Sequence, residues 1–236
     1  MSKDMKRLTA PRAWPVPRKT NIWIAKPSPG SHGIQESMPL VIVLRDVLGL
    51  ADTAREVKRI LGDRHVLVDG RVVTDLGFPV GLMDVVSIPK IELNYRMMLD
   101  RNGKFRLVKV AEGKQGWKLC RIEGKTTVAG GKTQLNLHDG RNLLVPKDAY
   151  KSGDVLKLEL PSQKILEVYK LSKGNTAMVI AGSHVGEIVV IEENIVRRTT
   201  SPNLVKFKDG RSTIKQNVFV VGTKSPEVDL PEASAL

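Results

Sequence analysis

The sequence predicts an α+β protein, in which a small helix-helix-hairpin module is followed by mostly β, barrel-like domains. The first observation is that Met38–Leu48 is apolar almost all round, which is typical of a buried helix. The second is a capped helix that leads into an Asp-Gly hairpin. The third is a series of short alternating segments from residue 94 onward, separated by turn residues, which favours small barrels or sandwiches. With 236 residues, the chain has room for two or three small domains.

The charge distribution indicates a polyanionic partner. The formal net charge is +13, and such an excess most often matches nucleic acid. Residues 1–37 hold seven Lys and Arg against two acidic residues, and residues 91–172 hold sixteen against nine. Residues 38–90 are balanced at seven each, and residues 173–236 hold eight against seven. Whether the helix-helix-hairpin module binds nucleic acid therefore depends on where its charges lie, not on how many it has.

Composition also restricts the cellular setting. The single Cys120 cannot form an internal disulfide, so we expect a reducing cytoplasm and a small core residue at this position. Aromatic residues make up 4% of the chain, which argues against a stacking platform for single strands. No apolar run is long enough to span a membrane and no signal-peptide pattern opens the chain, so we expect no membrane partner.

Residues 1–37 are predicted to be an extended basic arm, because five prolines interrupt any helix. The arm has too few apolar residues to fold alone, so we expect it to become ordered on RNA, with cations on phosphates and planar side chains stacked. The alternative is a solubilising tail with its two tryptophans tucked onto the body of the protein. The candidate RNA contacts are Lys3, Lys6, Arg7, Arg12, Trp14, Arg18, Lys19, Trp23 and Lys26.

Two helices are expected in residues 38–62. Pro39 suits the first turn of the apolar helix, and Gly49 suits its stop. The second helix begins with the capping-box spacing of Thr53 and Glu56 and ends at Gly62. Its residues Arg55, Lys58 and Arg59 share a basic face. That face holds RNA phosphates in one interpretation and is a solvated helix face in the other.

A hairpin is expected next, and its residues resemble those of a known RNA-binding module. Two β-branched runs flank Asp69-Gly70, which predicts a type I′ turn. Together with Leu50-Ala51, Arg55 and Met83–Ile88, the run His65–Gly70 resembles the RNA-binding module named after bacterial ribosomal protein four. Residues 38–93 would then form such a module, which grips structured RNA in that family. The resemblance implies RNA contacts at Arg55, Lys58, Arg59, Arg64 and Arg71.

Residues 94–172 are predicted to form a central β-domain. Turns are expected at Asn102-Gly103 (type I′), Gly124, Asp139-Gly140 and Pro161-Ser162. Seven basic residues are expected mostly at outward strand positions, where a solvated face is at least as good an interpretation as RNA contact for each one singly. They are Lys104, Arg106, Lys109, Lys118, Arg121, Lys125 and Lys132.

Residues 173–191 resemble a KOW motif, the β-turn-β unit of several ribosomal and transcription proteins, within an SH3-like C-terminal domain at residues 173–223. A strand leads into a loop with Gly182 and Gly186, and the glycines permit a tight turn and close backbone approach. Val189 and Val190 stand where the family usually has a Gly. The candidate contacts are Lys173, Asn175, Ser183 and His184, and His184 is alternatively a plain turn residue. Residues 224–236 are predicted to be an acidic tail, either disordered or draped on the surface.

The order of these parts resembles the archaeal and eukaryotic small-subunit ribosomal protein four of the e type. The resemblance is carried over nearly the whole chain by Lys6–Trp14, Pro27–His32, Pro39–Arg45, Gly81–Val85 and Asn217–Gly222, and it adds His32 and Arg45 to the candidate contacts. It implies a structural component of the small subunit that binds ribosomal RNA beside neighbouring ribosomal proteins, in the cytoplasm and without homo-oligomers. The short acidic tail favours an archaeal-type member.

Two other function classes compete. Pseudouridine synthases, which are RNA-modifying enzymes, carry the same four-type module, and their catalytic Asp is best imitated here by Asp139-Gly140-Arg141, where a turn is expected anyway. A transcription elongation factor would account for the KOW unit alone. One Cys and the four His at positions 32, 65, 138 and 184 lack metal-ligand spacing, and the common phosphate-loop and nucleophile motifs do not occur. We therefore expect no catalysis, metal or cofactor.

Overall fold

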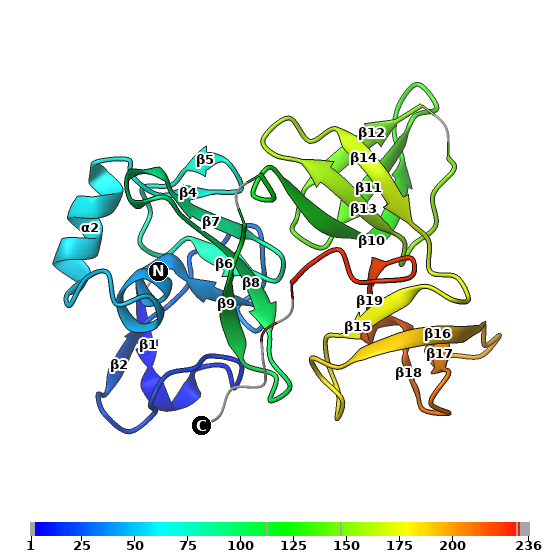
Figure 1. The fold of residues 1–236 in the computed structure, drawn as a ribbon, viewed down its shortest axis with the longest axis horizontal. Coiled ribbons are helices and arrows are strands. Elements are labelled where there is room, and N and C mark those ends of the chain that lie inside the picture. The colour runs from blue at the N-terminus through cyan, green and yellow to red at the C-terminus, as the bar shows by residue number, and fades with distance from the viewer. Residues whose placement is uncertain (1–2, 112, 147, 230, 232–236) are drawn as a thin grey trace. The chain divides into compact units, whose positions relative to one another are not determined.

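The chain folds into two compact units (Figure 1). The computed structural model describes residues 3–111, 113–146, 148–229 and 231. The first unit contains residues up to 98 together with 104–118 and 160–162, and the second unit contains the remainder. Strands dominate both units and helices are few, which confirms the mostly β part of the predicted α+β fold. No helix among the described residues is long and apolar enough to cross a membrane.

The first unit combines short helices with three small antiparallel sheets. One sheet has the strand order β5-β4-β7-β8-β9, and β1 pairs with β2 and β3 with β6. The strands are β1 (Asp4–Lys6), β2 (Trp23–Ala25), β3 (Ser37–Pro39), β4 (Leu67–Val68), β5 (Arg71–Val72), β6 (Pro79–Gly81), β7 (Val85–Ile88), β8 (Leu93–Leu99) and β9 (Phe105–Lys109). Its helical segments are η1 (Arg7–Thr9), α1 (Leu40–Ile42), η2 (Val43–Val47), α2 (Ala54–Gly62) and η3 (Pro89–Ile91).

The two helices predicted in residues 38–62 are both present. The apolar helix runs from Leu40 to Val47, with a π-helical second part, and its side chains from Leu40 to Leu44 are buried. Pro39 lies one residue before the first helical turn, as the N-cap. At α2 the capping box is formed as predicted: the Thr53 hydroxyl accepts the Glu56 amide and the Glu56 carboxylate accepts the Thr53 amide, each at 3.3 Å.

The N-terminal arm is a packed part of the first unit, contrary to the expectation that it becomes ordered only on RNA. β1 and β2 pair with each other, and Trp14 is 2% exposed with its indole N–H donated to the Ser37 carbonyl at 2.7 Å. The Phe105 amide donates to the Ala13 carbonyl at 2.8 Å. The physical reason is that hydrogen bonds to the body of the unit supply what the arm's own apolar residues lack. The alternative of tucked tryptophans is confirmed for Trp14.

The turn between β4 and β5 is confirmed, whereas two other predicted turns differ. Asp69 and Gly70 have φ of 51° and 74°, as a type I′ turn requires. Between β8 and β9 only Gly103 has positive φ, because the Asp100 side chain and carbonyl cap a longer loop. In the second unit Gly124 makes no turn. It lies at a bulge where the long strand β10 shifts register against β11, between Ile122 and Gly124.

A buried charge cluster connects separate parts of the first unit. Lys118 is completely buried, and its ammonium donates to Asp69 at 2.7 Å and to Asp84 at 2.8 Å. His32 Nε2 lies 3.0 Å from the other oxygen of Asp84, which also accepts the Gly81 amide at 3.0 Å. The remaining oxygen of Asp69 accepts the Val85 amide at 3.0 Å. The expectation that Lys118 points outward is wrong, because two buried carboxylates need its charge inside.

The second unit holds two five-stranded antiparallel sheets, of orders β12-β11-β10-β13-β14 and β18-β17-β16-β15-β19. Arg121, also predicted to face outward, is mostly buried. Its guanidinium donates to the carbonyls of Gln216 (2.6 Å) and Val218 (3.0 Å), and so joins the two sheets. The strands are β10 (Trp117–Thr127), β11 (Thr133–Leu137), β12 (Asn142–Val145), β13 (Val155–Glu159), β14 (Ile165–Tyr169), β15 (Thr176–Val179), β16 (Ile188–Ile195), β17 (Leu204–Phe207), β18 (Ser212–Ile214) and β19 (Val218–Gly222), with a short helical turn η4 (Lys215–Asn217).

The second unit has a core that includes the single cysteine, and part of the C-terminal tail packs against this unit. Cys120 lies in the core with Leu135, Leu156 and their neighbours, as predicted. Residues 224–229 of the tail lie against the unit: the Glu227 amide donates to the Val221 carbonyl at 2.9 Å, and Val228 is buried. The draped alternative is therefore confirmed for these residues, and positions 230 and 232–236 lie outside the described residues.

Replacement of Lys118 by Met tests the buried charge cluster. The change leaves two buried carboxylates without their cation, and we expect it to lower the free energy of unfolding by about 3–5 kcal/mol. Urea denaturation followed by circular dichroism measures the loss. The same replacement in a protein that already carries Asp69→Asn and Asp84→Asn should cost much less. Equal costs in both backgrounds would mean that the ion pairs are not coupled.

Acid should weaken the same cluster. Burial alone would raise the pKa of Asp84, but Lys118 and His32 outweigh it and hold this pKa well below its usual range. The unfolded chain therefore takes up this proton first, near pH 4, so the stabilisation is present above that pH and is lost as the pH falls further. Urea midpoints measured at descending pH should fall more steeply for the wild type than for Asp84→Asn. Parallel curves would contradict this.

Candidate RNA-binding surface

The basic face of α2 is exposed, as its spacing predicts. Val57 and Leu61 are buried beneath the helix, whereas Arg55, Lys58 and Arg59 lie in solvent. The Glu56 carboxylate is used within the cap, and its hydrogen bonds to the amides of Asp52 and Thr53 lower its pKa. Glu56, the acidic residue among these cations, therefore keeps its negative charge next to the backbone amides at the start of the helix. Arg64 and Arg71, also candidates, are exposed beyond α2 and on β5.

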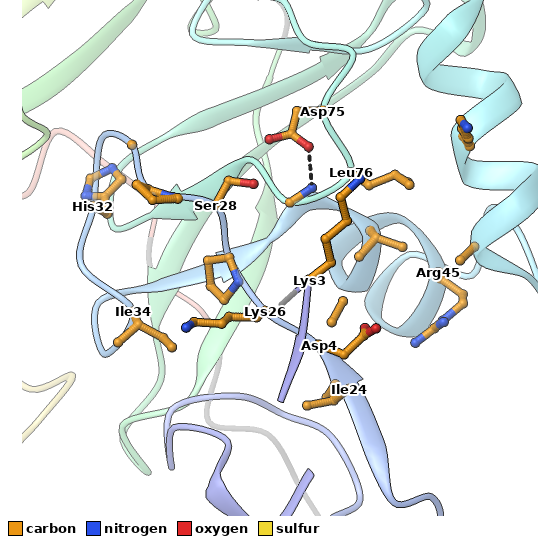
Figure 2. A pocket seen from close by; sticks show the side chains of 18 of the residues that line it. Lys3, Asp4, Ile24, Lys26, Ser28, His32, Ile34, Arg45, Asp75 and Leu76 are labelled. Carbon is orange, nitrogen blue, oxygen red and sulfur yellow. Dashed lines mark hydrogen bonds between the residues drawn. The ribbon is translucent and has the colours of Figure 1, made fainter. Parts of the chain in front are cut away.

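An open cleft of about 1320 Å³ lies in the first unit between the arm and the helices. Its basic lining comes from four separate places in the sequence: Lys3, Lys26, Arg45 and Lys58. Figure 2 shows Lys3 and Lys26 on the arm side and Arg45 on the helix side of this cleft. The apolar part of the lining includes Ile24, Pro27, Ile34, Val41 and Leu76. The fold thus combines candidates from the arm and from the module into one concave surface.

The side chains that line the cleft carry a net positive formal charge. Lys3, Lys26 and Lys58 make no ion pair with any residue that the structure describes, and Arg45 pairs only with its neighbour Asp46, at 2.8 Å. Two carboxylates line the cleft, and one of them, Asp75, accepts the Gly77 amide at 3.0 Å. Unpaired ammonium groups around an apolar floor suit a ligand that carries phosphates on an apolar or planar framework.

Four candidates of the arm have structural roles instead. Trp14 is in the core and has no ring face for a base. Arg7 is buried and donates to the Pro17 carbonyl at 2.5 Å, and Arg18 donates to the carbonyls of Leu8, Ala10 and Pro11. His32 belongs to the buried charge cluster. We correct the prediction for Trp14, Arg7 and His32, because each is enclosed and already bonded, while Arg18 is half-buried and holds the arm's turn.

The remaining arm candidates are accessible. Lys3, Lys6, Arg12, Lys19, Trp23 and Lys26 are exposed. Trp23 is 55% exposed, and the Lys6 ammonium lies 3.9 Å from the centroid of its ring. This cation–π contact holds a positive charge beside a planar face. The sequence placed Trp14 and Trp23 in the same class, and only the burial of one of them separates their roles.

The candidate contacts at and before the loop between β15 and β16 differ in exposure. Lys173, Ser183 and His184 are exposed, whereas Asn175 is half-buried and donates to the Lys170 carbonyl at 2.7 Å, so it holds the turn. A Cβ at Gly186 would overlap the Asp100 carbonyl, so this glycine lies against the backbone of the loop that contains Asp100. Arg211, which the sequence did not single out, lies 3.0 Å from His184 Nδ1 and 2.6 Å from Glu187, and its hydrogen bond lowers the pKa of Glu187.

The residues that would best suit an enzyme or a metal site already make structural contacts. Asp139 is buried and accepts both the Arg141 amide (3.2 Å) and the Cys120 thiol (3.6 Å). Cys120, His138 and Asp139 cluster tightly enough to suggest a metal. However, His138 Nδ1 accepts the Arg121 amide at 3.2 Å, whereas a metal-bound histidine normally donates from its second nitrogen. The Arg141 guanidinium, 3.3 Å from Asp139, already supplies a positive charge there.

Comparison with known proteins gives a consistent result along the chain. The profile of the ribosomal family S4e matches residues 91–165, that of the RS4NT (NUC023) domain matches residues 1–35, and that of the S4 domain matches residues 38–86. The chain is 44% identical over 233 residues to the small ribosomal subunit protein eS4 of Methanothermobacter thermautotrophicus, with 97% of this chain and 96% of the relative covered. The protein of the same name from Korarchaeum cryptofilum is 39% identical, with 97% of each chain covered.

A solved structure is similar as well. The crystal structure of the 30S ribosomal protein S4e from Thermoplasma acidophilum superimposes with a TM-score of 0.70 at 37% sequence identity. The match covers 80% of this chain and 96% of that one. Over that part of the chain, the arrangement of strands and short helices is therefore shared with a protein whose sequence has diverged at most positions.

The two tryptophans of the arm provide a matched test of its packing. Trp14→Ala should lower the free energy of unfolding by about 3–5 kcal/mol, because it removes a buried indole and its hydrogen bond. Trp23→Ala, at an exposed position, should change it by less than about 0.5 kcal/mol. Urea denaturation followed by circular dichroism compares the two. If Trp14→Ala were as mild as Trp23→Ala, the arm would not be packed on the unit.

Proposed function

The chain belongs to the ribosomal family S4e, and from this premise we propose that it is a structural component of the small ribosomal subunit that binds ribosomal RNA. The observation that carries the proposal is the near full-length identity to proteins that bear the name of this component. Its partners are then ribosomal RNA and neighbouring ribosomal proteins, its place is the cytoplasmic ribosome, and it acts without catalysis and without forming homo-oligomers.

The RNA surface that we propose begins at the cleft of the first unit. Lys3 and Lys26 approach from the arm, and Lys58 approaches from α2. Because these three ammonium groups have no ion-pair partner among the described residues, they are free to replace counterions on phosphates. The apolar floor beneath them suits riboses or unpaired bases. Arm and module therefore act as one binding surface.

The exposed face of α2 and the β4–β5 hairpin extend this surface. Arg55 and Arg59 lie on α2, and Arg64 and Arg71 lie beyond it. The formal neutrality of residues 38–90 understates the local field. Asp69 and Asp84 are buried against Lys118, so these two carboxylates do not offset the exposed arginines.

The second unit contributes in a different way. We propose that residues 94–172 and 173–223 act as a central β-domain and a KOW-type SH3-like domain, following the four-type module at 38–93. In support, β15 and β16 form the expected strand-loop-strand unit with glycines of positive φ at 182 and 186. Lys173, Ser183 and His184 are the exposed loop groups available to RNA. The excess positive charge of residues 91–172 adds long-range attraction.

The two alternatives have no support of their own. A modifying enzyme requires a free catalytic carboxylate, and its best candidate, Asp139, is buried and fixes a hairpin turn. An elongation factor would account for the KOW-type unit but not for the match of residues 38–86 to the S4 domain. The relatives across the length of the chain are named as ribosomal proteins.

RNA binding by the full-length protein tests the proposal. We expect the affinity for a transcript of archaeal small-subunit ribosomal RNA, measured by filter binding, to fall steeply with KCl concentration. Arg55→Ala with Arg59→Ala should weaken binding about tenfold and reduce the salt slope by about 1.4–1.8, the share of two phosphate contacts. The thermal melt should be unchanged, since both side chains are exposed.

The matched control is Lys132→Ala with Lys170→Ala, which removes two exposed charges from the second unit. We expect this pair to cost no more than about twofold in affinity, because it acts only through the overall charge. Equal losses for both pairs would show that net charge, and not the α2 surface, determines binding. An affinity of the wild type that does not depend on salt would refute the electrostatic account.

A further inference from the structure

The hairpin of β16 and β17 ends in a tip that the proposed function leaves without a role. The last ladder pair joins Ile195 to Leu204, and residues 196–203 form the loop beyond it. The Arg197 amide donates to the Asn203 side-chain oxygen at 3.0 Å, which closes the base of the loop. We refer to residues 195–202 as the hairpin tip. Figure 1 shows this hairpin as the orange strands of the second unit.

The hairpin tip presents apolar side chains to solvent. All of its residues are exposed, and Val196 and Ile195 are 70% and 36% exposed. Earlier on β16 the pattern is different, because Val189 and Ile191 are buried in the core. Most of the Val196 side chain, at the end of the hairpin, lies in solvent and not in the core of its own unit. This side chain is therefore available to another molecule.

The charge of the hairpin tip identifies the chemistry of that molecule. Arg197 and Arg198 follow the aliphatic pair and make no ion pair with any described residue. Residues 194–208 contain four cationic residues and no acidic one. Three hydroxyl residues, Thr199 to Ser201, complete the tip. Two adjacent guanidinium groups without carboxylates suit phosphates, with which arginine forms paired hydrogen bonds.

We propose that the hairpin tip is a second RNA contact of this protein, and that it docks on the minor groove of an RNA double helix. That groove is wide and shallow and exposes riboses, so Val196 packs against sugar carbons while Arg197 and Arg198 bind the phosphates at its edge. The tip hydroxyls lie within the same exposed loop and suit the ribose 2′-hydroxyls. This inference rests on the proposed function, because it assumes that the protein binds ribosomal RNA.

Binding measurements on the full-length protein test the charged part of the tip. The probe is the same transcript of archaeal small-subunit ribosomal RNA, at a series of KCl concentrations. Arg197→Ala with Arg198→Ala should weaken binding about tenfold and reduce the salt slope by about 1.4–1.8. Arg197→Lys with Arg198→Lys keeps the charges and should restore most of the slope. The thermal melt should not change, because the side chains are exposed.

The outcomes separate this inference from the proposed function. If the wild type does not bind the transcript, both are refuted. If the wild type binds and the α2 variant is weakened, while the tip variant keeps full affinity and slope, only the tip contact is refuted. A tip variant that binds RNA normally but enters small subunits poorly would assign the tip to a protein neighbour, which would also overturn the inference.

A site-directed probe tests the position of Val196. Val196→Cys can be coupled to an iron chelate that cleaves nearby RNA, and the native Cys120 is completely buried, so labelled wild type is the control. We expect cleavage on both strands of one RNA helix, across its minor groove, and loss of this cleavage when Arg197→Ala and Arg198→Ala are added. Cleavage equal to that of the labelled wild type would contradict the docking geometry.

Discussion

The first unit depends on one buried interaction, the contact of the Lys118 ammonium with Asp69 and Asp84. Asp69 forms the hairpin turn after β4, Asp84 receives the Gly81 amide and His32 from the arm, and Lys118 comes from the start of β10. Three segments distant in the sequence are thereby held at one point. A buried ion pair adds little net stability over an apolar core, but a carboxylate left without its cation is costly. The cluster therefore favours one arrangement of arm, hairpin and strand, and the cleft between arm and helices is part of that arrangement.

Local signals in the sequence were sufficient for the elements of the module. The capping box of α2 and the type I′ turn at Asp69-Gly70 depend on a few neighbouring residues, and both are present. Burial was not predictable in the same way. Lys118 and Arg121 both lie on β10, in a run of buried residues from 118 to 122, and their charges are satisfied there by tertiary partners that the sequence does not reveal. For the same reason the turn predicted at Gly124 is wrong: a glycine is equally typical of a turn and of a bulge, and the pairing of β10 with β11 decides between them.

The candidate site shows the same division between local and tertiary information. The basic face of α2 was readable from residue spacing, because Val57 and Leu61 identify the buried side. Composition predicts correctly that the arm is basic but wrongly that it is unfolded, since the hydrogen bonds from Trp14 and Phe105 to distant carbonyls are not visible in composition. A packed arm lowers the conformational entropy that is lost on binding. Its lysines are already positioned at the cleft, so the protein does not have to order the whole segment when it meets RNA.

The central claim is that the arm and the module form one preformed cleft for ribosomal RNA. The most direct test is a cryo-electron microscopy map of the small ribosomal subunit that contains this protein. The account predicts RNA in the cleft, with phosphate oxygens about 3 Å from the ammonium groups of Lys26 and Lys58 and with the arm in the position that it has in the free protein. A cleft filled by a neighbouring protein, or an arm detached from Trp14 onward and spread on RNA elsewhere, would contradict it.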